Sequence, residues 1–229
     1  MVTMANTTQR TERRADALSK QRIVEAAIEI LDKDGESALT FRALAARLAT
    51  GAGAIYWHVA DKNELLAAAT DAVIARVMRG VLRGTEPRQA IRAIALGLFD
   101  AIEAHPWAGA QLSRAPWQAS VGEIFESVGS QVDALGVTEQ AQLDVASALM
   151  HYILGCAGQN AANAANARLL PPDTDRAAFL ATIIARWTQR DPAGFPFLHK
   201  MAARFAEHDD RAQFLAGIDL ILAGVATVR

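Results

Sequence analysis

The polar and aromatic side chains with the most informative spacing lie in residues 40–66, TFRALAARLATGAGAIYWHVADKNELL. Thr40 can cap a helix whose apolar residues, beginning with Leu44, recur at helical spacing. Residues 49–51 interrupt this pattern, and a second short helix is expected over about residues 52–58. Two short helices joined by a tight turn predict a helix-turn-helix, the arrangement that places its second helix in the major groove of DNA.

The second of these helices is suited to close contact with DNA. Ala52, Gly53 and Ala54 have almost no side chain, so the backbone can approach a phosphate or a base edge. Tyr56 and Trp57 follow, and adjacent helical residues point about 100° apart. The two rings cannot both face one core, so we expect at least one to point toward solvent or a partner.

A third helix is expected to begin next to this pair. Asp61 and Glu64 have the spacing of a capping box, which starts a helix. Lys62 then falls in the first turn, where the helix dipole disfavours a positive charge. A nearby phosphate would remove that objection, so Lys62 is a candidate phosphate contact.

Residues 18 to 70 resemble the DNA-binding domain of the TetR family of bacterial transcriptional repressors, in particular its tetracycline repressor branch. The resemblance is carried by Leu44-Ala45, Leu48, Ile55-Tyr56-Trp57-His58-Val59, Lys62 and Leu65-Leu66. It implies phosphate contacts from Thr40, Arg42, Tyr56, His58 and Lys62. It implies base-facing positions at Gly51, Ala52, Gly53, Ala54 and Trp57. The family usually has glycine at Ala49 and an apolar residue at Thr50, so the turn departs from the family pattern.

Each of these residues also has an ordinary structural interpretation. An aromatic pair on a helix can belong to a core, His58 can be a surface histidine, and Lys62 can be a solvated charge. Their combination at these spacings favours DNA contact over those separate explanations.

Composition is typical of a helical regulator. The chain has 229 residues, of which 52% are hydrophobic, enough to bury a substantial core. A single cysteine excludes an internal disulfide framework. Neither a signal peptide nor a long uncharged apolar stretch is present, so we expect a soluble, cytoplasmic protein that does not contact membranes.

We expect three regions along the chain. Residues 1–17 form a flexible basic arm, which either reaches DNA or only increases solubility. Residues 18–66 form a three-helix DNA-binding domain, and residues 67–229 form a helical domain for ligand binding and dimerisation. The predicted fold is therefore all-α. The remaining helices are expected at 19–34, 62–83, 87–104, 106–114, 118–135, 138–168, 174–190, 195–206 and 209–227.

Two of these helices are predicted to meet copies of themselves in a homodimer. Residues 138–168 and 209–227 carry repeated apolar residues, and in the TetR family the corresponding helices of two subunits form a four-helix bundle. The expected interface residues are Leu149, Ile153, Ala157, Phe214, Ile218 and Leu222. The alternative is that these faces form a core within one subunit.

The middle helices of the chain concentrate aromatic and polar side chains. Such a mixture suits a pocket for a small hydrophobic or aromatic effector, and equally a core whose polar atoms are satisfied. The candidate ligand-binding residues are Phe99, His105, Trp107, Trp117, Phe125, His151, Tyr152, Gln159 and Asn163.

Catalysis finds little support in the sequence. His151 and Cys156 are about 140° apart on one presumed helix, which is poor geometry for a nucleophile and its base. The histidines lack metal-site spacing, so we expect no metal and no cofactor. We therefore predict a non-enzymatic homodimeric repressor that binds double-stranded operator DNA and is released by a small molecule. A helical DNA-binding protein without a small-molecule input is the alternative, and a helical enzyme is a more distant one.

Overall fold

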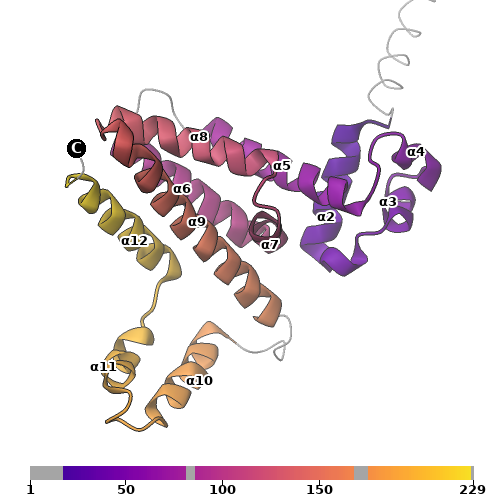
Figure 1. Ribbon diagram of the computed structural model, residues 1–229. Helices are drawn as coiled ribbons and strands as arrows, with labels where there is room; N and C mark the ends of the chain where they lie inside the picture. Colours follow the sequence, from indigo (N-terminus) through magenta and orange to yellow (C-terminus); the bar gives the residue numbers. More distant parts are fainter. Residues whose placement is uncertain (1–17, 81–85, 168–174, 228–229) are drawn as a thin grey trace, which may run out of the picture.

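The computed structural model describes residues 18–80, 86–167 and 175–227, and within these ranges the chain is helical and contains no strands (Figure 1). The predicted all-α fold is confirmed. The predicted basic arm, residues 1–17, lies outside the described residues. Within the described part of the chain, none of the helices has both the length and the apolar character that a membrane span needs.

The N-terminal part is a small helical domain from which one long helix leads away. Its elements are α2 (Lys20–Asp34), the short 3-10 helix η1 (Glu36–Ala38), α3 (Phe41–Arg47), α4 (Ala52–Tyr56) and α5 (Lys62–Gly80). Ser19 caps α2, because its hydroxyl accepts a hydrogen bond from the Arg22 amide at 3.3 Å. Gly35 ends α2 with a φ of 79°, a conformation that glycine adopts without steric cost.

Over residues 86–167 and 175–227 the C-terminal part has seven helices, whose observed bounds lie within two residues of the predicted ones. They are α6 (Pro87–Ala104), α7 (Pro106–Arg114), α8 (Ala119–Ala134), α9 (Glu139–Ala167), α10 (Arg176–Thr188), α11 (Pro196–Phe205) and α12 (Asp210–Val225). Proline fixes the start of α6, α7 and α11, because its missing N–H and fixed φ suit the first helical turn. Figure 1 shows α5 connecting the N-terminal domain to the body formed by α6, α8, α9 and α12.

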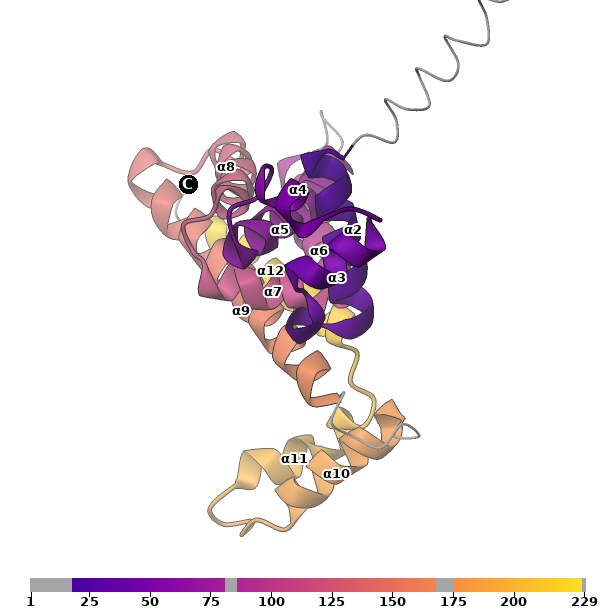
Figure 2. The same cartoon turned by 90° about the vertical axis from the view of Figure 1, so that its right-hand side faces the viewer.

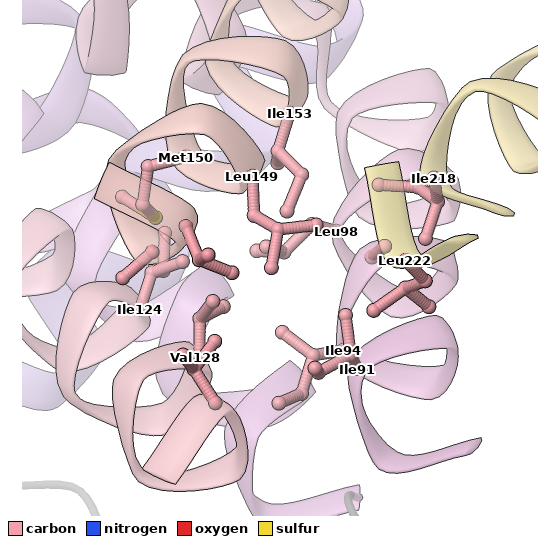
Figure 3. Close-up of a cluster of buried hydrophobic side chains, with 14 of the residues drawn as sticks. Ile91, Ile94, Leu98, Ile124, Val128, Leu149, Met150, Ile153, Ile218 and Leu222 are labelled. Atoms are coloured by element: carbon pink, nitrogen blue, oxygen red, sulfur yellow. The ribbon is translucent and has the colours of Figure 1, made fainter. Parts of the chain in front are cut away.

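Each part has its own apolar core. Figure 3 shows side chains of α6, α8, α9 and α12 pointing toward one another in the C-terminal body. The six residues predicted to form a dimer interface lie inside this core. They are Leu149, Ile153, Ala157, Phe214, Ile218 and Leu222, and none is more than 3% exposed.

This placement corrects the predicted interface side chains. Helices α9 and α12 are those proposed for dimerisation, but the chosen residues occupy their inward faces. Both helices are apolar on more than one face, and apolar periodicity does not tell which face meets a neighbour in the same subunit.

Helices α10 and α11 form a hairpin that extends away from the rest of the molecule in both views (Figures 1 and 2). The two helices pack mainly against each other. Within them only Leu180 and Ala202 are buried, while Phe197 is 69% exposed. The hairpin therefore adds little to the core of its own subunit.

The turn between α3 and α4 contains a strained residue. Ala49 has a φ of 51°, and it is the only described residue other than glycine with a positive φ. The left-handed region costs an L-residue about 1–2 kcal/mol, because its Cβ crowds the following carbonyl. The glycine of this turn, Gly51, has an ordinary extended conformation with a φ of −82°. The conformational demand falls on Ala49.

We expect Ala49→Gly to raise the free energy of unfolding by about 0.5–1 kcal/mol, because glycine removes this strain. Ala46→Gly is the matched control. Ala46 is an exposed residue of α3, where glycine should instead cost about 1 kcal/mol. Urea unfolding at one fixed protein concentration measures both changes, and a destabilising Ala49→Gly would contradict the strain argument.

Candidate nucleic-acid interface

Helices α3 and α4 are held to the N-terminal domain by a few buried side chains. Thr40 caps α3 as predicted, because its hydroxyl accepts a hydrogen bond from the Ala43 amide at 3.1 Å. Leu44 and Ala45 bury one face of α3, and Ile55 is the only buried residue of α4. The rest of α4 is therefore open to a partner.

The aromatic pair beside α4 points away from the core. Tyr56 is 55% exposed and Trp57 is 89% exposed. The Tyr56 ring stacks on Phe41, with ring centroids 4.2 Å apart and planes within 4° of parallel. The prediction that at least one ring leaves the core is confirmed, and the Phe41 stack fixes the direction of Tyr56.

The start of α5 is capped by the predicted pair of acidic residues, with one shift in register. The Asp61 carboxylate accepts a hydrogen bond from the Glu64 amide at 2.9 Å. The Glu64 carboxylate accepts one from the amide of Ala60, at 2.7 Å, and this hydrogen bond together with Lys20 lowers the pKa of Glu64. The entry of the chain into α5 is therefore held from both sides.

Lys62 has a partner within the domain. Its Nζ donates a hydrogen bond to the Glu36 carbonyl oxygen at 2.6 Å, across the start of α5 and η1. The helix dipole disfavours a positive charge at the start of α5. The Glu36 carbonyl supplies the compensating negative partner that the sequence analysis had assigned to a phosphate. An ammonium group has three donors, so two N–H groups of Lys62 remain for other acceptors.

None of the ten predicted DNA-contacting residues is buried. Thr40, Arg42, Gly51, Gly53, Tyr56 and Trp57 are exposed, and Ala52, Ala54, His58 and Lys62 are half-buried. Figure 1 shows α3 and α4 on the side of the N-terminal domain that is remote from the C-terminal body. The predicted residues thus share one accessible end of the molecule.

The structure distributes the nine candidate ligand-binding residues over several places. Trp117 is 96% exposed, Phe125 is 37% exposed, and His151, Gln159 and Asn163 also lie on the surface of the subunit. His105 and Trp107 lie instead at the boundary with the N-terminal domain, where both contact Asp32 of α2. Only Phe99 and Tyr152 come together in the body.

These two rings flank Phe214 of α12. The ring centroid of Phe214 lies 5.1 Å from that of Phe99 and 5.5 Å from that of Tyr152. The Tyr152 hydroxyl donates to the Phe214 carbonyl at 3.1 Å, and its ring lies over Gly217, where a Cβ would come within 2.0 Å of the hydroxyl oxygen. The three rings form a stack that links α6, α12 and α9.

A narrow crevice, without room for a water molecule, lies beside this stack. Its lining residues are Phe99, Ile102, Ile153, Cys156, Ala157, Asn160 and Phe214. Burial raises the pKa of the Cys156 thiol, and burial together with Cys156 raises the pKa of Tyr152 to about 12. Both groups are therefore neutral at physiological pH, and none of the lining side chains carries a charge.

The sequence analysis assigned Ile153, Ala157 and Phe214 to the dimer interface, and so missed their part in this crevice. The useful signal was the spacing of Ile153, Cys156, Ala157 and Asn160 at three- and four-residue intervals, which places them on one face of a helix.

Two family descriptions match nearly the whole chain. Residues 23–69 match the bacterial regulatory proteins of the tetR family, and residues 84–229 match the tetracyclin repressor-like C-terminal domain. The chain belongs to the TetR family. Its N-terminal part therefore has the helix-turn-helix domain of this family, as the sequence predicted.

Individual relatives agree with this assignment. The transcriptional regulator SCO7222 of Streptomyces coelicolor is 52% identical, with a TM-score of 0.81 over 93% of this chain and 100% of that one. An HTH-type transcriptional regulator of Saccharopolyspora erythraea is 35% identical over 60% of this chain and 59% of its own length. The chain thus spans about three fifths of that curated relative. A BioQ structure with its double-stranded DNA operator is 33% identical, with a TM-score of 0.56 over 64% of this chain and 88% of that one.

We expect Lys62→Gln to weaken binding to all DNA duplexes about equally, because it removes a positive charge that is predicted to contact a phosphate. The slope of log affinity against log salt should fall by roughly 0.9 for each subunit. Lys33→Gln is the control, since Lys33 is an exposed lysine in the last turn of α2. Fluorescence anisotropy over a salt series measures both variants, and an unchanged slope for Lys62→Gln would exclude the phosphate contact.

Proposed function

We propose that the protein is a homodimeric repressor that binds a palindromic operator and releases it when a small molecule enters the C-terminal domain. The observation that carries the proposal is the exposed α4 with Trp57 and the fixed Tyr56 ring at its end. A recognition helix as short as α4 reads few bases. Two copies related by a two-fold axis read two half-sites, about 34–36 Å or a multiple of it apart.

The outward faces of α9 and α12 supply the proposed dimer interface. On α9 these faces carry Ala148, His151, Gly155, Gln159 and Ala162, which recur at three- and four-residue intervals and are exposed. On α12 they carry Ala216, Leu220, Ala223 and Gly224, and Leu220 is 75% exposed. Small residues let two helices approach closely, and α12 is apolar on its open face as well as on its buried one.

We expect Leu220→Arg to produce a folded monomer that has lost most of its affinity for a palindromic duplex, because it places a charge in an apolar interface. The duplex is selected with the wild-type protein from a randomised DNA pool. Analytical ultracentrifugation gives the oligomeric state, and circular dichroism confirms the fold.

Ile218→Arg is the contrasting variant, two residues away on the same helix. Ile218 is fully buried in its own subunit, so arginine there should unfold the chain. A native dimer formed by Leu220→Arg would contradict the proposed interface.

The crevice beside the aromatic stack is the proposed effector site. It has uncharged walls and one amide side chain, Asn160, that can orient a ligand. A charged ligand would lose its hydration without a compensating partner, so we propose an uncharged, planar aromatic effector. The crevice has no room for even a water molecule, so a drug-sized effector must move the surrounding helices apart in order to bind. The effector-bound protein would then differ in conformation from the free protein, as release of DNA requires.

We expect Asn160→Leu to abolish release of DNA by uncharged planar aromatic compounds, because leucine removes the only amide that can orient a ligand in the crevice. The assay titrates a panel of neutral and charged aromatic compounds into the complex with the selected duplex and follows anisotropy. Trp117→Ala is the control, because Trp117 is 96% exposed and lies outside the crevice.

If releasing compounds act equally on wild type and Asn160→Leu, the crevice is not the effector site. If only charged compounds release the duplex, the proposed ligand class is contradicted.

A further inference from the structure

We infer that Asp32 and Glu36 are positioning residues for DNA recognition. They attach α7 to the DNA-binding domain, so that α7 acts as a strut that holds the angle of that domain. Helix α7 lies between the two domains, next to α2 and α9 (Figure 1). Each of its ends is bound to the N-terminal domain through one of these carboxylates. Neither carboxylate belongs to the surface of α3 and α4 that faces DNA.

The first attachment lies at the start of α7. The Trp107 indole N–H donates to Asp32 Oδ1 at 2.7 Å, and His105 Nδ1 lies 2.7 Å from the same oxygen. A carboxylate only accepts hydrogen bonds, so Nδ1 carries the proton in this contact. The two rings also meet edge to face, with centroids 5.9 Å apart. Two donors on one charged oxygen make a directional joint between α2 and the α6–α7 corner.

Apolar packing reinforces this joint. Trp107 is only 7% exposed, and Ala108 is fully buried. Both belong to the apolar cluster of the DNA-binding domain, and not to that of the C-terminal body. The start of α7 is therefore inserted into the domain that it orients.

The second attachment lies at the end of α7. The Arg114 guanidinium donates to both oxygens of Glu36, at 2.6 and 3.3 Å, and these hydrogen bonds lower the pKa of the Glu36 carboxyl. The backbone carbonyl of Glu36 holds Lys62 at 2.6 Å. One residue thus connects the end of α7 with a proposed phosphate contact.

The opposite face of α7 is fitted closely to α9. A Cβ at Gly109 would lie 2.7 Å from the Ala157 carbonyl oxygen, and a Cβ at Gly158 would lie 2.9 Å from the Ser113 hydroxyl. Ala157 also lines the crevice. Because the backbones touch, α7 cannot stay in place if this part of α9 moves.

The contacts that Asp32 and Glu36 make with α7 lie within one chain, so they do not depend on which DNA sequence is bound. Breaking them should widen the range of angles between the domains while leaving both domains folded. Binding to a palindromic duplex needs both recognition helices at fixed positions and should suffer, whereas non-specific binding tolerates a range of angles. The expected effect on duplex binding rests on the proposed function, but the expected effect on the angle between the domains does not.

The test measures the distance between spin labels at Glu25→Cys in α2 and Glu123→Cys in α8, two exposed positions, in a Cys156→Ser background. Labelled chain is mixed with a large excess of unlabelled chain, so that only distances within one subunit contribute. We expect Asp32→Ala to broaden the distance distribution, and Trp107→Phe, which removes the indole N–H but keeps a smaller buried aromatic ring, to broaden it less.

Glu29→Ala is the matched control. Glu29 lies one turn before Asp32 on α2, but it pairs with Arg47 inside the DNA-binding domain. Its removal should leave the distance distribution unchanged. If Asp32→Ala and Trp107→Phe also match the wild type, the strut is excluded, whatever happens to DNA binding.

A second measurement concerns recognition. Asp32→Ala should lower affinity for the selected duplex by about fivefold or more, while affinity for an unrelated duplex changes by less than about twofold. An equal loss on both duplexes would show a general loss of folded protein, and would overturn the assignment of Asp32 as a positioning residue. The distance measurement uses neither DNA nor effector, so it separates failure of this inference from failure of the proposed function.

Discussion

The relative position of the two domains depends on one side chain that is buried across their boundary. The indole of Trp107 comes from the C-terminal part of the chain but is buried in the core of the DNA-binding domain. Its N–H must then find an acceptor, and Asp32 provides one at 2.7 Å. Pulling the domains apart would expose a large aromatic surface and leave a carboxylate without its donors. The DNA-binding domain therefore cannot be oriented independently of α7.

The predicted DNA-binding surface, in contrast, is held by few buried side chains. Ile55 is the only buried residue of helix α4, and the turn before this helix contains a residue in a left-handed conformation. An element with so few buried side chains takes its position from its neighbours, here the Phe41–Tyr56 stack and the capped start of α5. Precision at the recognition helix thus originates in residues that are not themselves proposed to contact bases.

Sequence patterns predicted the helices well, because their signals are local. The prolines at the first positions of α6 and α7, and the caps at Ser19 and Thr40, act on residues within one helical turn. The partners of Trp107 and Ile218 could not be predicted in this way. A buried indole or isoleucine has the same apolar signature whichever helix covers it, and Asp32 is separated from Trp107 by 75 positions in the chain. Placement of the crevice failed for the same reason, since its walls come from three helices.

The hairpin of α10 and α11 differs from the rest of the molecule in its local stability. Its base is closed by Arg176, which binds the Asp210 carboxylate at 2.7 Å and the His208 carbonyl at 3.0 Å. Few of its side chains are buried, so its opening costs little beyond its own contacts and leaves the apolar body intact. Amide hydrogens in this hairpin should therefore exchange with solvent through local opening, well before those of α6 or α9. The chain thus contains a segment whose order is set by its local sequence and by whatever it touches, and not by the global stability of the fold.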